Sequence, residues 1–152
     1  MERVEKSIEI QCPLRTVYNQ WTQFEEFPRF MEGVTRVTQL DDSRLHWEAD
    51  IAGTHKEWNA RIVDQVPDQR IAWESEGGEP IAGVVSFEPS PSGPDCTRVN
   101  VELSYDPDGF VESLGDAVGV VSYRVQKDLE NFKDFIENRR QETGAWRGTI
   151  RE

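Results

Sequence analysis

The chain has few of the residues that build metal centres and disulfide scaffolds, since its 152 residues include two cysteines and two histidines. Cys12 and Cys96 are too few and too far apart for a metal-binding knuckle, so we expect both to pack as small apolar side chains. One domain of this length can bury ~70% of its unfolded surface, which makes neither a metal nor a disulfide necessary for folding. We therefore predict no metal and no cofactor.

Long hydrophobic runs and an excess of basic residues are also absent. No apolar run approaches the roughly 20 residues that span a bilayer, and the first ten residues, MERVEKSIEI, lack the apolar core of a signal peptide. We expect a cytoplasmic protein without membrane insertion. The net charge of -12, from 29 acidic and 17 basic residues, repels phosphate groups, so binding to nucleic acid is not expected.

Aromatic residues, by contrast, recur in a regular pattern. Short segments that alternate apolar and polar residues, separated by turn residues, predict antiparallel strands. Their ranges are Arg3–Ile10, Val34–Leu40, Arg44–Ile51, Thr54–Val66, Gln69–Ser75, Gly83–Glu88 and Thr97–Tyr105. Side chains alternate between the two faces of a strand, so one face collects the aromatic residues Trp47, Trp58, Trp73, Phe87 and Tyr105. A sheet with one polar face and one face of rings needs a cover over the rings.

A long helix near the end of the chain is the predicted cover. After a first helical stretch with Phe110 and Leu114, an apolar stripe runs through Val118, Val121, Val125, Leu129, Phe132 and Ile136. The polar positions beside the stripe, Asp128 among them, are expected to face solvent. We predict one domain over residues 1–142 and a short tail over 143–152, whose Trp146 is expected to be frayed or docked on a neighbour.

Two short helices are predicted after the first strand. Pro13 suits the first position of a helix, and Leu14 to Trp21 has the spacing of one apolar helical face. Pro28 interrupts the segment FEEFPRFM, so a second short helix should turn Phe27, Phe30 and Met31 toward the interior.

Both histidines fall on the polar face of the predicted sheet. His46 and His55 share the parity of Glu48 and Glu57, near the turn that contains Gly53. We interpret them as a cross-strand surface cluster and not as a metal site, because metal ligands need convergent geometry and a supporting second shell. No nucleophile elbow or paired-histidine spacing is present, so no catalytic triad is assigned.

The segments YNQWTQFEEFPRFMEGVTRV, EWNARIVDQVPDQRIAW, GVVSFEP and VGVVSYRVQKDLENFKDFIE resemble the polyketide cyclase/dehydrase and coenzyme Q-binding branch of the START-like (SRPBCC) superfamily. The resemblance implies an α+β helix-grip (START/Bet v 1-like) fold, in which a curved antiparallel sheet of about seven strands wraps a long carboxy-terminal helix. It also implies a cavity for hydrophobic or aromatic molecules. In similar aromatase/cyclases the strand corresponding to Glu57–Val63 turns polar side chains into that cavity, where this chain has Ala60 and Ile62. The fold would also bring Cys12 and Cys96 close together, which leaves a disulfide open.

The leading hypothesis is non-catalytic binding of a small hydrophobic or aromatic molecule of polyketide, quinone or lipid type. Its predicted binding residues are Phe27, Phe30, Met31, Trp47, Trp58, Trp73, Phe87, Tyr105 and Val121. One alternative is a polyketide cyclase or dehydratase that uses Tyr105 or Arg124 as its polar group. The other is a protein interaction module, in which the tail around Trp146 docks a partner or a second copy to form a homodimer.

Overall fold

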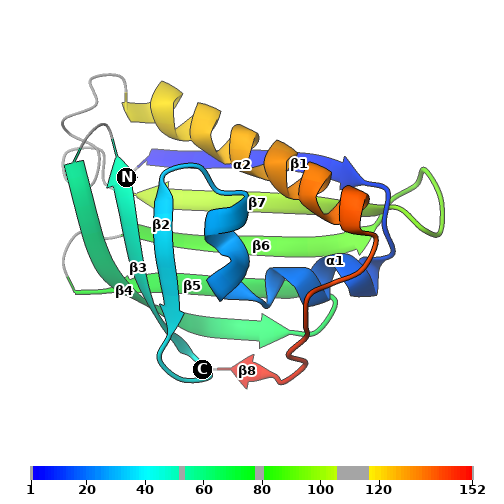
Figure 1. Cartoon of the computed structure of the whole chain (residues 1–152), viewed down its shortest axis with the longest axis horizontal. Coiled ribbons are helices and arrows are strands. Elements are labelled where there is room, and N and C mark those ends of the chain that lie inside the picture. The colour runs from blue at the N-terminus through cyan, green and yellow to red at the C-terminus, as the bar shows by residue number, and fades with distance from the viewer. Residues whose placement is uncertain (1, 52–53, 78–80, 106–116, 152) are drawn as a thin grey trace.

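Seven strands form one antiparallel sheet in the computed structural model, which describes residues 2–51, 54–77, 81–105 and 117–151 (Figure 1). The strands are β1 (Glu2–Ile10), β2 (Val34–Gln39), β3 (Arg44–Ile51), β4 (Thr54–Val66), β5 (Arg70–Glu76), β6 (Ile81–Pro89) and β7 (Thr97–Tyr105). Their order across the sheet is β1-β7-β6-β5-β4-β3-β2. Each predicted strand is therefore present. Strands β2 to β7 are neighbours in the sheet in the same order as in the chain, and β1 pairs with β7 at the edge opposite β2.

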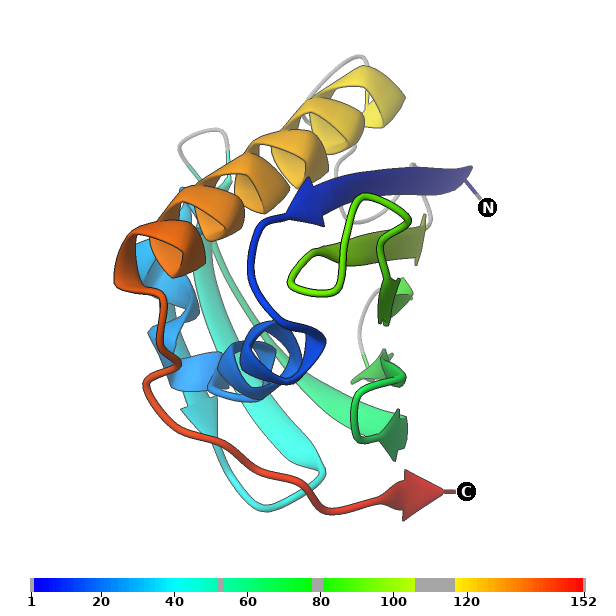
Figure 2. The ribbon, with the colours of Figure 1, turned by 90° about the vertical axis from the view of Figure 1, so that its right-hand side faces the viewer.

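The sheet is strongly curled, so that its two ends face each other (Figure 2). The hydrogen-bonding register shifts between Val34 and Arg36 and again between Ile62 and Asp64. Such irregularities bend a strand and increase its local twist. The curl gives the sheet a concave face that one helix can cover.

The long helix α2 (Ala117–Arg139) lies across the concave side of the sheet (Figures 1 and 2). Its apolar stripe is buried at Leu129, Phe132 and Ile136, as predicted. The earlier helical stretch predicted around Phe110 and Leu114 lies outside the described residues. This arrangement is the α+β helix grip that the sequence indicates.

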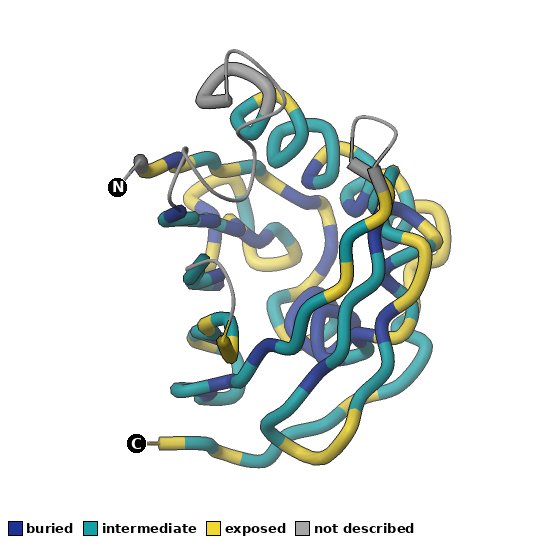
Figure 3. The backbone as a smooth tube through the Cα atoms, turned by 90° about the vertical axis from the view of Figure 1, so that its left-hand side faces the viewer, coloured by how far each residue is buried: buried dark blue, intermediate teal, exposed yellow. Residues whose placement is uncertain are grey.

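Two short helices fill one end of the curl. They are α1 (Leu14–Trp21) and the 3-10 helix η1 (Phe24–Arg29), in which Pro28 lies. Trp21 on α1 packs edge to face against Phe132 on α2, with ring centroids 4.8 Å apart. Most of α1 is buried, as its dark blue colour in Figure 3 shows.

The tail after residue 142 packs against its own domain, which differs from the prediction. Strand β8 (Ile150–Arg151) pairs with β4, and the Trp146 N–H donates a hydrogen bond to Thr22 Oγ1 at 3.1 Å. Arg147 donates hydrogen bonds of 2.6 Å to Asn19 and to Asp68. The prediction of a frayed tail is therefore wrong for the described residues, whereas docking of a neighbour by the tail and the boundary after residue 142 stay predictions.

Two smaller expectations can be compared with the structure directly. Cys12 is buried and Cys96 partly buried, and both are free thiols, so the disulfide that the sequence left open is not formed. Among the described residues, no helix is long and apolar enough to cross a bilayer.

Candidate functional site

A cavity of about 500 Å³ lies between the concave face of the sheet, η1 and α2. Its volume falls within the range of about 300–1,000 Å³ that is usual for small-molecule sites. Most of its wall is apolar, and the residues concerned are Trp21, Phe24, Phe27, Met31, Val34, Leu45, Trp47, Ala49, Trp58, Ile62, Ile71, Trp73, Ile81, Val101, Leu103, Val121, Val125 and Leu129. Gly33 and four charged residues, Glu32, Asp50, Arg124 and Asp128, complete the wall.

Aromatic rings form an ordered surface on the β3–β4 side of the cavity. Trp47 and Trp58 are directly opposite each other across the two strands, and their rings stack at 5.9 Å with an angle of 6° between the planes. Phe27 of η1 lies 5.6 Å from Trp47, between centroids. These rings give the cavity a flat aromatic side, which suits a flat ligand better than a round one.

Trp73 extends this surface onto β5 by lying against Gly83 of β6. A Cβ atom at Gly83 would come within 2.4 Å of the Trp73 ring, a distance that real Cβ atoms do not show. Trp73 and Gly83 are also direct partners in the β5–β6 register. The absence of a side chain at Gly83 thus makes room for the indole.

The predicted binding residues separate into two groups. Those in the cavity wall are Phe27, Met31, Trp47, Trp58, Trp73 and Val121. Phe30, Phe87 and Tyr105 are not among the residues that line it.

The three residues outside the wall belong to packed parts of the interior. Phe87 packs on Tyr18 at 5.3 Å, and Phe30 packs on Phe132 at 5.2 Å, between ring centroids. Tyr105 is buried with Val4 beside the amino-terminal strand. Of the two residues considered as catalytic groups, Arg124 is therefore in the cavity wall and Tyr105 is not.

The cavity-facing side of β4 is apolar. This strand contributes Trp58 and Ile62 to the wall, and Ala60 between them is buried. The two positions at which similar cyclases carry polar groups are thus filled by small or aliphatic side chains here. The polar side of the cavity comes from a different element.

Helix α2 supplies that polar side through Arg124 and Asp128, one helical turn apart. The Arg124 guanidinium donates a hydrogen bond from Nη1 to the Glu32 carbonyl. Gly33, with a φ of 91°, allows this approach, since a Cβ there would come within 2.6 Å of Arg124 Nη1. The turn between η1 and β2 thus positions Arg124 at the edge of the cavity.

Asp128 is the residue that the sequence analysis placed wrongly. It was expected in solvent, but burial raises the pKa of its carboxyl to about 7; the Arg124 charge and a hydrogen bond with the Glu32 backbone lower that pKa, and the Glu32 charge raises it. Its Oδ1 is buried and has no hydrogen-bond partner among the described residues. The Glu32–Gly33 turn covers this part of α2, and no signal in the helical spacing alone reveals such a cover.

A second polar atom in the cavity wall lacks a partner. Trp47 Nε1 is buried and finds no acceptor in the part of the chain that the structure describes. An unpaired buried donor costs about 1–3 kcal/mol.

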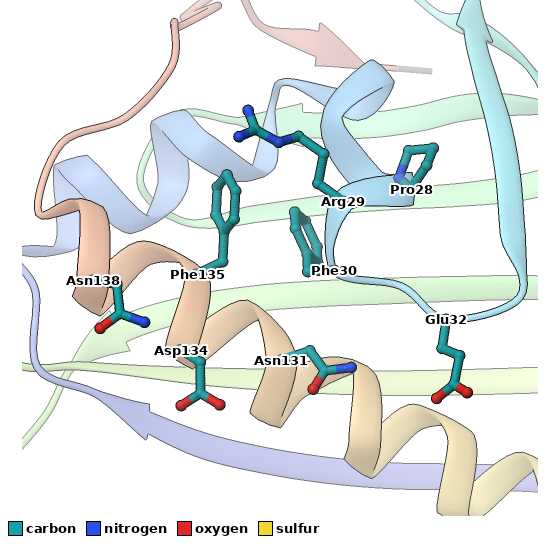
Figure 4. A pocket seen from close by; sticks show the side chains of 8 residues that line it. All are labelled: Pro28, Arg29, Phe30, Glu32, Asn131, Asp134, Phe135 and Asn138. Atoms are coloured by element: carbon teal, nitrogen blue, oxygen red, sulfur yellow. The ribbon is translucent and has the colours of Figure 1, made fainter.

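A depression of about 460 Å³ lies on the outer side of α2, next to η1, and Figure 4 shows the side chains that surround it. Its apolar part is the Phe135 ring, which carries the Arg29 guanidinium at 5.1 Å and the Arg139 guanidinium at 5.7 Å. Because two cations already lie against the Phe135 ring, this depression is a weaker ligand site than the cavity.

The fold and the lined cavity define a class of proteins that hold hydrophobic molecules between a curled sheet and a helix. Residues 10–134 match the family described as polyketide cyclase/dehydrase and lipid transport, and the chain belongs to this family. An uncharacterised 17.2 kDa protein of Streptomyces lincolnensis is 48% identical over 151 residues, which are 99% of each chain. The family and its START-like fold were both predicted from the sequence, and both predictions are confirmed.

Two solved structures show the same architecture. A START superfamily protein from Mycobacterium smegmatis superposes with a TM-score of 0.72 at 17% identity, over 88% of this chain and 98% of its own. The aromatase/cyclase Zhui from a Streptomyces species superposes with a TM-score of 0.73 at 16% identity, over 95% and 99%. At such low identity these similarities show the fold alone.

Proposed function

We propose that this protein binds a flat, mostly apolar aromatic molecule that carries one or two oxygen atoms, such as a quinone or an aromatic polyketide. The observation that carries the proposal is the cavity wall, in which stacked indoles adjoin two unpartnered polar atoms, Trp47 Nε1 and Asp128 Oδ1. A plain acyl chain would fill the volume but would leave both polar atoms unpaired. Family membership supports a small hydrophobic ligand in general terms.

Calorimetric titration with a quinone, an aromatic polyketide and a fatty acid tests this proposal. We expect one molecule of the aromatic ligands to bind per chain, more tightly than the fatty acid. Trp73→Leu should weaken binding about tenfold or more, because it removes part of the aromatic wall. Trp146→Phe is the matched control, since Trp146 is in the tail and not in the wall. Binding that is absent at sub-millimolar concentration, or equal in both variants, would contradict the proposal.

Asp128 favours a second candidate function, which is catalysis of a cyclisation or dehydration. A carboxyl with a pKa of about 7 is partly protonated near neutral pH, so it can give a proton to a departing hydroxyl, which leaves as water, and the resulting carboxylate can take the proton that the substrate carbon loses. Arg124 in the same wall can stabilise a developing negative charge on a carbonyl oxygen. The apolar positions of β4 weigh against this candidate.

The two candidates differ in what Asp128→Asn does. Asparagine keeps the size of the side chain and can still form hydrogen bonds, but it cannot transfer a proton. If the protein only binds, Asp128→Asn should change ligand affinity moderately, and the wild type should not convert any substrate of a polyketide panel. Turnover by the wild type that is lost in Asp128→Asn, with binding retained, would establish the enzyme.

A further inference from the structure

The outer face of the β3–β4 hairpin carries six polar side chains in three cross-strand pairs. The register places His46 opposite Asn59, Glu48 opposite Glu57, and Asp50 opposite His55. These residues alternate along their strands with Trp47, Ala49 and Trp58, so the polar cluster and the cavity wall occupy opposite faces of the same hairpin, except that Asp50 at the end of β3 borders both. Both histidines of the chain are in this cluster.

Glu48 and Glu57 form a like-charged pair at the centre of the cluster. Like charges directly opposite each other in an antiparallel pair are destabilising, so a positive group between them is favoured. His46 is two residues before Glu48 on β3, and His55 is two residues before Glu57 on β4, so the two imidazoles reach this pair from opposite sides. His46 Nε2 lies 3.0 Å from Glu57 Oε1, and His55 Nε2 lies 3.1 Å from Glu57 Oε2.

The other ring nitrogen of each histidine is held by an oxygen atom. His46 Nδ1 lies 2.7 Å from Asn59 Oδ1, and His55 Nδ1 lies 3.0 Å from Asp50 Oδ1. These oxygens only accept, so each Nδ1 carries a proton, and because Glu57 also only accepts, each Nε2 shares a proton with Glu57 until an ion replaces it. Proteins orient metal-binding histidines in this way, with a carboxylate or carbonyl on the nitrogen that does not bind the metal.

The Nε2 atoms and the carboxylates converge closely enough for one ion. One ligand atom each from His46, Glu48 and Glu57 lie within 4.8 Å of one another, and His55 Nε2 is 4.0 Å from Glu48 Oε1. Ligand atoms around a tetrahedral ion with bonds of 2.0–2.1 Å are about 3.3 Å apart. The His46–Glu57 separation of 3.0 Å is already near this value, so small side-chain rotations would close the site.

We propose that His46, Glu48 and Glu57 bind a divalent transition-metal ion on the outer face of the β3–β4 hairpin, with His55 next to the site. Imidazole nitrogen and carboxylate oxygen together suit Zn²⁺ best among the common ions, whereas Mg²⁺ prefers oxygen alone. The ion would take the place of the protons that the imidazoles now share with Glu57. The sequence favoured a cluster without an ion because convergent atoms and a second shell were not evident, and the geometry supplies both.

Calorimetric titration of the full chain with ZnCl₂ at about pH 8, where histidine is mostly neutral, tests the proposal. We expect one Zn²⁺ per chain at micromolar concentration, with MgCl₂ giving no signal. Glu57→Gln and His46→Gln should each weaken Zn²⁺ binding about tenfold or more.

Glu74→Gln provides the matched control. Glu74 is an exposed glutamate that pairs with Arg61 across β4 and β5 at 3.0 Å, without a histidine partner. Zinc affinity in Glu74→Gln should equal that of the wild type. If Zn²⁺ does not bind at micromolar concentration, or if Glu57→Gln and His46→Gln bind it within tenfold of the control, the proposal is overturned. Circular dichroism of each variant checks that its fold is retained, so that a loss of binding reports on the ligands.

Discussion

Trp47 and Trp58 face each other across β3 and β4 with their ring planes 6° from parallel and their centroids 5.9 Å apart. Both rings are in the cavity wall. Two indoles at this separation couple electronically, so their circular dichroism differs from the sum of two isolated chromophores. The stacked pair therefore provides a spectroscopic signal for the candidate binding site.

Replacing either ring of the pair should remove this signal. We expect an exciton couplet in the indole region of the circular dichroism spectrum, which both Trp47→Phe and Trp58→Phe abolish. Trp73→Phe should keep it, because Trp73 lies on β5 against Gly83 and not in the stacked pair. A couplet that survives both substitutions would contradict the observed stacking.

Asp128→Asn is expected to stabilise the protein more at high pH than at low pH. The pKa of Asp128 is raised from 3.8 to about 7 in the folded chain, so between these values the unfolded chain loses the proton while the folded chain keeps it. The free energy of unfolding contributed by this group therefore falls as pH rises through that range and stays low above it. Asparagine has no such cost, so the gain should be on the order of 4 kcal/mol at about pH 8 and close to zero at about pH 4.

Urea denaturation of the wild type and Asp128→Asn at both pH values measures this difference. Asp134→Asn, at an exposed position of the same helix, is the control for removing a negative charge. A gain from Asp128→Asn that is the same at both pH values would mean that the carboxyl is not buried as described.

Gly33→Ala should destabilise the protein more than Gly77→Ala does. Both glycines have a positive φ, of 91° and 70°, so alanine costs about 1–2 kcal/mol of backbone strain at either position. A Cβ at Gly33 would also meet Arg124 Nη1 at 2.6 Å and the Asp50 carbonyl at 3.1 Å, whereas Gly77 has open space around it. Gly33→Ala should therefore lower the free energy of unfolding by at least ~1 kcal/mol more than Gly77→Ala, as measured by chemical denaturation. This difference reports on the contact that positions Arg124. Equal losses would show that Arg124 moves aside freely.

Arg147→Ala should lower the free energy of unfolding by about 1–3 kcal/mol. Arg147 joins the tail to the domain through Asn19 and Asp68, and its guanidinium lies 5.6 Å from the Tyr18 ring centroid. Its removal leaves the buried Asn19 amide oxygen without this donor. Arg15→Ala, at an exposed position on α1, should change stability little. The comparison is made by thermal and chemical denaturation, and an equal effect of the two substitutions would mean that the tail docks without Arg147.

The sequence predicted the sheet well because strand parity is a local property. Trp47, Trp58 and Trp73 all occupy apolar positions of alternating segments, and all three are in the cavity wall. The same parity holds for Phe87, which instead packs against Tyr18 on α1. Whether an inward ring lines a cavity or fills the core depends on which helix covers it, and alternation along one strand does not contain that information.

Asp128 and the tail illustrate a second limit of sequence reasoning. Helical spacing places Asp128 beside the apolar stripe, where a charged residue normally reaches solvent. Its burial follows from the Glu32–Gly33 turn, nearly a hundred residues earlier in the chain. In the same way, the role of Arg147 in holding the tail becomes recognisable only once Asn19 and Asp68 have been brought together by the fold.

The pairing of β8 with β4 also has a consequence for association between molecules. Strand β3 follows β4 only as far as the pair Arg44–Arg61, so Asp64 and Gln65 extend beyond it. Ile150 and Arg151 occupy this position instead. An uncovered strand edge invites another chain to add to the sheet, and the short β8 strand covers this one. The short strand β8 thus protects this part of the β4 edge from edge-to-edge aggregation.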